Sequence, residues 1–167
     1  MDLSLQTILY RLLALLVVVG VHGLALAGLW RIFGERQPQY DGRLTPNPLT
    51  HLDLLAIIPF LFCQIGWIRP MPSGTDKPVS PSTAFVVALG SLALTLGVAM
   101  LLWIARPMIV GMITNVSVAA GFTAAIRIVL EMSTWFVLFN LLPIIPLTMG
   151  TVLNQIAKPA AEFLEKY

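Results

Sequence analysis

Charged side chains are scarce in this sequence. Only 11% of its 167 residues are Asp, Glu, Lys or Arg and 57% are hydrophobic, whereas soluble globular domains carry about 25% charged residues. The net charge of +2 comes from scattered basic residues and not from a Lys/Arg patch interleaved with aromatic side chains. Nucleic-acid binding is therefore not expected. The length fits a single membrane domain, residues 1–167.

Cysteine is almost absent as well. Cys63 is the only one, so an internal disulfide is excluded and a thiolate metal cluster is not expected. It lies in an apolar run, and we interpret it as a small buried or lipid-facing side chain rather than a reactive thiol. No cofactor is expected, because the sequence offers nothing beyond a single intramembrane histidine to hold one.

Charge is missing from long stretches of the chain, and this predicts membrane-spanning helices. Crossing the hydrocarbon takes about 20 apolar residues in a helix. We expect an all-α, polytopic membrane helix bundle with four or five spans. The expected spans are residues 5–30, 54–69, 83–105, 108–126 and 128–147, and the separate span at 108–126 decides between four and five.

Polar segments separate these runs. They are the linker 31–53, the loop 70–82 and the C-terminal tail 150–167. The linker is the most basic of them, so the positive-inside tendency places it in the cytoplasm and the N-terminus outside. Arg11 stands near the start of the first span and is expected to extend to the membrane interface.

Three segments occur in an order that is typical of one protein family. They read GRLTPNPLTHLD at residues 42–53, GWIRPMP at residues 66–72 and FNLLPIIPL at residues 139–147. Together they resemble the site-2 protease family of intramembrane zinc metalloproteases, in its short bacterial branch. The resemblance implies a site-2-protease-like helical core and a multi-pass location in the bacterial cytoplasmic membrane.

The catalytic residues of that family are replaced at most of the matching positions of this sequence. The family binds zinc through two histidines of a His-Glu-x-x-His motif and an aspartate near the end of the chain, with the glutamate as general base. Here His22 matches the first histidine, Gly23 and Leu26 replace the base and the second ligand, and Thr148 replaces the aspartate. The resemblance therefore implies an inactive member, with no enzyme activity, no catalytic residue and no metal beyond the remnant His22.

Seven further residues are candidates for contacts between helices or with a partner protein. They are Asn140, Pro143, Pro146, Gly90, Gly97, Arg127 and Glu131. The amide offers an interhelical hydrogen bond, the glycines permit close helix approach, and the prolines free backbone groups that need partners in lipid. The Arg and Glu are four residues apart, so on one helix they share a face and are expected to pair.

The preferred interpretation is a non-catalytic structural or accessory subunit of a larger membrane complex, for which a respiratory or photosynthetic complex is a suggested host. Its expected partners are other integral membrane proteins and the lipid bilayer. One alternative is a regulatory pseudoprotease that binds or sequesters transmembrane substrates of an active relative. The other is a membrane enzyme with an unorthodox metal site around His22 and His51.

Overall fold

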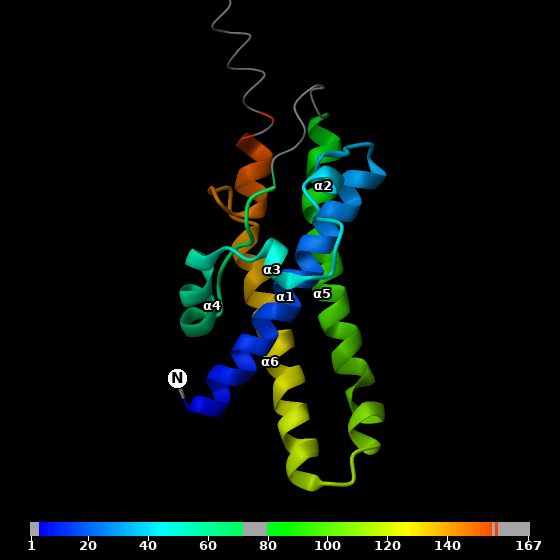
Figure 1. Ribbon diagram of the computed structural model, residues 1–167, viewed down its shortest axis with the longest axis vertical. Coiled ribbons are helices and arrows are strands. Elements are labelled where there is room, and N and C mark those ends of the chain that lie inside the picture. The colour runs from blue at the N-terminus through cyan, green and yellow to red at the C-terminus, as the bar shows by residue number, and fades with distance from the viewer. Residues whose placement is uncertain (1–3, 72–79, 155, 157–167) are drawn as a thin grey trace, which may run out of the picture.

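The computed structural model describes residues 4–71, 80–154 and 156, and this part of the chain is built from helices (Figure 1). The elements are α1 (Leu5–Ile32), α2 (Gln37–Tyr40), α3 (Pro48–His51), the 3-10 turn η1 (Leu54–Ala56), α4 (Ile57–Cys63), α5 (Pro81–Gly111) and α6 (Val116–Asn140). Residues 148–154 are helical as well. The all-α prediction is confirmed.

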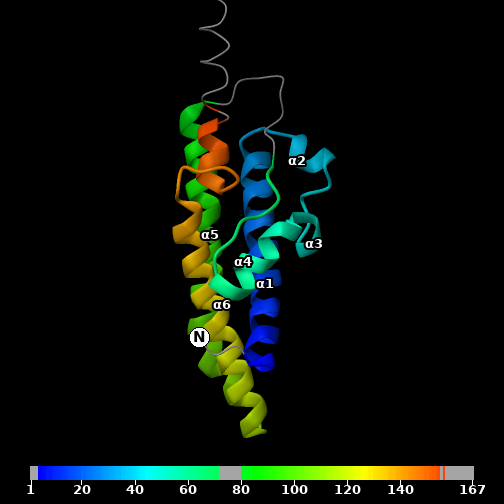
Figure 2. The same ribbon diagram turned by 90° about the vertical axis from the view of Figure 1, so that its left-hand side faces the viewer.

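Three long helices form the bundle. α1, α5 and α6 pack against one another, and α5 and α6 form a hairpin whose closed end extends past the N-terminus of α1 (Figures 1 and 2). Side chains such as Val19, Ala88 and Met132 are fully buried between them. Each of the three helices is long and apolar enough to cross a membrane. The fold is therefore that of a membrane helix bundle, and its described part contains three candidate spans where four or five were expected.

One correction concerns the region around Pro107. The expected break there, with a separate span at 108–126, is wrong because α5 continues through Pro107 to Gly111. In hydrocarbon an interrupted helix leaves backbone groups without water, so a proline is accommodated inside a helix more readily than a loop is. The chain turns later, and Asn115 begins α6 by accepting hydrogen bonds from the backbone of Ser117 and Val118.

The expected span at 54–69 is the second correction. These residues form η1, the seven-residue α4, and an extended return that begins where Gln64 adopts a left-handed conformation with φ 61°. Seven helical residues rise only about 10 Å, whereas the hydrocarbon core is about 30 Å thick. The return segment instead folds back on the linker, through an isolated antiparallel bridge between Leu52 and Ile68.

Arg11 explains how the short α4 is held beside α1. Its side chain is only 5% exposed, and Nη1 donates hydrogen bonds to the carbonyls of Leu61 at 2.6 Å and Phe62 at 3.3 Å. Carbonyls in the last turn of a helix lack helical partners and carry partial negative charge. Arg11 therefore caps α4 inside the protein, and its position relative to the membrane interface stays a prediction.

Several other expectations end differently or lie outside the described residues. α1 extends two residues into the expected linker, which itself contains α2 and α3. The last long helix ends at Asn140 instead of 147, and the expected tail begins as helix over residues 148–154. Most of the expected loop, residues 72–79, and the tail beyond residue 156 lie outside the described residues. The single domain and the orientation in the membrane stay predictions.

Candidate functional site around His22

His22 lies at the centre of the three-helix bundle. It projects from α1 and its side chain is fully buried. Nδ1 lies 3.0 Å from Oγ1 of Thr95 on α5, and Nε2 lies 3.0 Å from Oγ1 of Thr148 in the C-terminal segment. Both ring nitrogens therefore face threonine hydroxyls.

The protons of this cluster can be assigned from its neighbours. The Thr95 hydroxyl donates to the carbonyl of Ser91 at 2.7 Å, so its oxygen accepts from Nδ1–H of His22. In a neutral ring Nε2 is then an acceptor, which fits donation from the Thr148 hydroxyl. The same hydroxyl lies 3.1 Å from Oδ1 of Asn140. One hydroxyl proton thus serves two acceptors, and Nε2 has no unoccupied direction toward a metal.

Asn140 connects this cluster to two further segments. Its Nδ2 donates to the carbonyl of Gly66 at 2.8 Å and to that of Phe136 at 2.9 Å, while Oδ1 accepts from the backbone amide of Thr148 at 3.1 Å. The Phe136 ring meets His22 edge-on, with centroids 4.9 Å apart. The amide is fully buried and fully used. It therefore fixes the return segment and the C-terminal segment to the end of α6.

Glycines on α1 make room for the linker to cross it. A Cβ added at Gly20 would lie 3.1 Å from the carbonyl oxygen of Pro46, and one added at Gly23 would overlap the ring of His51. The two glycines are three residues apart and so share a face of the helix. Gly23 is therefore required by the contact with His51, whatever its relation to a catalytic motif.

His51 is itself tightly held in the linker. Its Nε2 donates to the carbonyl of Thr45 at 3.0 Å, and its own carbonyl accepts from the backbone amide of Arg69 at 2.8 Å. Burial lowers the pKa of the His51 imidazole below its usual value, which favours the neutral ring. Nδ1 is buried and has no hydrogen-bond partner among the described residues.

Leu26, Gly90 and Gly97 are the remaining motif and glycine positions, and they lie at packing contacts or on open helix surface. Leu26 is 6% exposed and belongs to the apolar core. A Cβ at Gly90 would lie 3.0 Å from Cδ1 of Leu29 on α1, whereas one at Gly97 would meet nothing within 4 Å. Of these two predicted glycines, only Gly90 therefore lies close to a neighbouring helix.

The two prolines lie beyond the end of α6. Pro143 is exposed and Pro146 is half-buried in the turn that leads to Thr148. Sequence reasoning missed Thr95, the hydroxyl that contacts His22 from α5. The available signal was a hydroxyl side chain in an otherwise apolar span, but in most helices such hydroxyls bond only to their own backbone.

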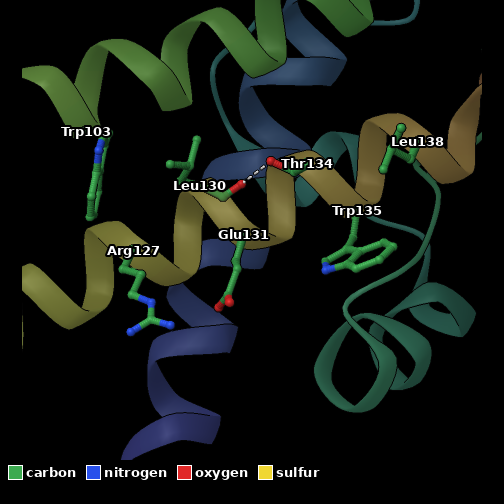
Figure 3. Close-up of a pocket in the computed structure, with 7 residues that line it drawn as sticks. All are labelled: Trp103, Arg127, Leu130, Glu131, Thr134, Trp135 and Leu138. Atoms are coloured by element: carbon green, nitrogen blue, oxygen red, sulfur yellow. Dashed lines mark hydrogen bonds between the residues drawn. The ribbon is translucent and has the colours of Figure 1, made fainter.

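A second polar feature lies on the outside of the bundle. Arg127 and Glu131 project from the same side of α6 and are exposed (Figure 3). The expected ion pair between them is not formed, and neither side chain has a hydrogen-bond or ion-pair partner in residues 4–71, 80–154 and 156. They border a cavity of about 390 Å³ whose other lining residues are Trp103, Leu130, Thr134, Trp135 and Leu138.

Comparison with known proteins bears on the family. A protein of Bacillus subtilis (strain 168) named "Putative zinc metalloprotease YwhC" is 30% identical over 155 residues, which are 90% of this chain and 70% of that protein. The chain belongs to the site-2 protease family. No family model and no solved structure matches it.

Membership in the site-2 protease family corrects one expectation. It also requires a test of whether the residues present can bind a catalytic zinc. The expected lack of enzyme activity is contradicted, because the name of this relative points to a protease. A catalytic zinc takes three protein ligands from His, Asp, Glu or Cys. In the described part of the chain no group of three such residues is placed to hold a metal, and His22 is surrounded by hydroxyls and an amide. The donors around His22 therefore do not fit zinc.

The close contact at Gly23 generates the first prediction. Gly23→Ala should lower the free energy of unfolding by about 1–3 kcal/mol, the usual cost of overpacking, because its methyl group overlaps the His51 ring. Gly28→Ala is the matched control on the same helix, since a Cβ there meets nothing within 4 Å. It should be neutral or stabilise by up to about 1 kcal/mol. Unfolding in mixed micelles measures both, and equal effects would contradict the contact.

The hydroxyl of Thr148 generates the second prediction. Thr148→Val keeps the shape but removes the hydroxyl. Nε2 of His22 then loses its hydrogen-bond partner, at a cost of about 1–3 kcal/mol, whereas Oδ1 of Asn140 keeps the backbone amide of Thr148. Thr123→Val is the control, because the Thr123 hydroxyl bonds only to a carbonyl of its own helix. It should change the free energy of unfolding by less than about 0.5 kcal/mol. A Thr148→Val protein as stable as the control would refute the proposed role of the hydroxyl.

Proposed function

We propose that this site-2 protease family member acts through contact with other integral membrane proteins, as a structural or accessory subunit of a complex in the bacterial cytoplasmic membrane. The observation that carries the proposal is the exposure of Arg127 and Glu131 on α6. Arg127 lies eleven residues after Val116 and thirteen before Asn140, and is therefore near the middle of the helix.

Charges at this depth need a polar partner. An arginine at the centre of a membrane-spanning helix costs about 2.5–3.5 kcal/mol on insertion scales, and such residues usually face a bundle interior or a water-filled cavity. Here they face outward on the least covered of the long helices. In the most apolar 18-residue stretch of each helix, 22% of the residues are buried in α6 and 50% in α1. A neighbouring protein that covers this surface would remove the cost.

The closed cluster around His22 supports the same proposal. Its hydroxyls and the Asn140 amide are used in holding α1, α5, α6 and the return segment together. A bundle fixed internally in this way presents a stable outer surface, which is what a subunit of a larger assembly needs.

A site-specific photocrosslinker tests the proposal in native membranes. Placed at Trp135 beside the cavity, it should give a discrete protein adduct. Placed at Leu101, it should give lipid adducts only; this exposed α5 residue lies two positions from Trp103 and so points to nearly the opposite side of that helix. Absence of a protein adduct at Trp135, or equal adducts at both positions, would contradict the proposal.

A second candidate function is zinc-dependent peptide hydrolysis, which the name of the Bacillus subtilis relative favours. The donors around His22 give it no support. Metal analysis of the purified protein and cleavage of a model transmembrane substrate examine it directly. Stoichiometric zinc together with cleavage that a chelator abolishes would establish it.

A further inference from the structure

The order of the two charges on α6 weakens the attraction between them. Arg127 precedes Glu131 by four residues. At this spacing an acid placed before the base is the favourable order, and the reverse order gains less. Figure 3 shows both side chains leaving the same side of the helix without meeting. Each is therefore available to a charge on a neighbouring chain.

The surroundings of this pair have the pattern of a helix–helix seam. The residues on this face are Ala120, Ala124, Arg127, Glu131, Thr134 and Leu138, spaced four, three, four, three and four apart. All of them are exposed or half-buried. This alternation keeps one face turned toward a roughly parallel neighbouring helix in a left-handed pair. The alanines and the threonine are small enough to permit close approach. We call this set of six residues the α6 seam.

We propose that the occupant of the α6 seam is a second copy of this chain, held by two reciprocal ion pairs between Arg127 of each copy and Glu131 of the other. The inference rests on the proposed function, because it names the partner at the same surface. Its ground is charge complementarity: the seam carries one acid and one base, so each Arg127 can pair with the Glu131 that lies one helical turn along the other copy's α6.

Symmetry makes this arrangement feasible in a membrane. A two-fold interface uses the same patch on both copies. Copies inserted in the same orientation are related by an axis along the membrane normal, so their α6 helices run parallel. Arg127 and the opposing Glu131 are then offset by four residues, about 6 Å along the axis, which two long side chains can span. The cavity between Trp103 and Trp135 borders the seam and offers space for apolar side chains of the other copy.

Charge exchange in the full chain tests the proposal. Single-molecule photobleaching in lipid bilayers at decreasing protein density should show a dimer for the natural sequence. Arg127→Glu alone and Glu131→Arg alone should each weaken it at least tenfold, because like charges then meet. The double exchange R127E/E131R should restore the dimer to within about threefold. Arg36→Glu, a reversal at an exposed residue outside the spans, should have no effect.

A disulfide trap provides an independent measurement that leaves the charges in place. In a Cys63→Ser background, Leu138→Cys should form an oxidised dimer of about twice the 18.2 kDa chain mass, whereas Leu101→Cys should not. If the reversal variants do not fold, this measurement still tests the proposal.

The outcomes separate this inference from the proposed function. A natural chain that stays monomeric at every density and gives no Leu138 dimer overturns the second copy. A dimer that neither reversal weakens, or that the double exchange fails to restore, also overturns it. If in these cases the Trp135 crosslinker still yields a different protein, the function stands with another partner. If that adduct is missing as well, both fail.

Discussion

The imidazole of His22 is hydrogen-bonded on both sides inside a membrane bundle, and the arrangement of the other elements depends on this. One nitrogen is held by Thr95 of α5 and the other by Thr148 of the C-terminal segment, at 3.0 Å each. In hydrocarbon there is little gain from burying one apolar face against another, so polar contacts and close packing between helices carry more of the specificity. The alternative for each of these buried groups is to remain unsatisfied, at a cost of about 1–3 kcal/mol.

Sequence reasoning was most successful where hydropathy alone decides. The charge-free run in α1 and the membrane class follow from the length of apolar helix that a bilayer requires. The same criterion failed at residues 54–69, because it does not distinguish a short helix folded back inside the protein from a span. It failed at Pro107 because α5 continues through the proline to Gly111. The burial of Arg11 depends on carbonyls fifty residues away in the chain, which no local pattern reveals.

The site shows a similar division. Motif comparison selected His22 and Thr148, and the structure brings them into contact although 126 residues separate them. It did not select Thr95, because hydroxyls in helices commonly bond to their own backbone. Nor did it reveal that Gly23 lies against His51, which gives this glycine a packing role. The misfit to zinc follows already from Gly23, Leu26 and Thr148 in the sequence, and the coordinates add that hydroxyls and an amide surround His22 instead.

The contacts around His22, Asn140 and His51 together form a closed ring. From His22 the ring passes through Thr148 and Asn140 to the carbonyl of Gly66. It continues along the return segment to His51, whose ring lies on Gly23, the neighbour of His22. A closed ring has no free end at which a shift can be absorbed, so strain at one contact is shared by all. Its members should therefore be energetically coupled, as residues of one network are, and α1 cannot tilt or rotate independently of the linker and α6.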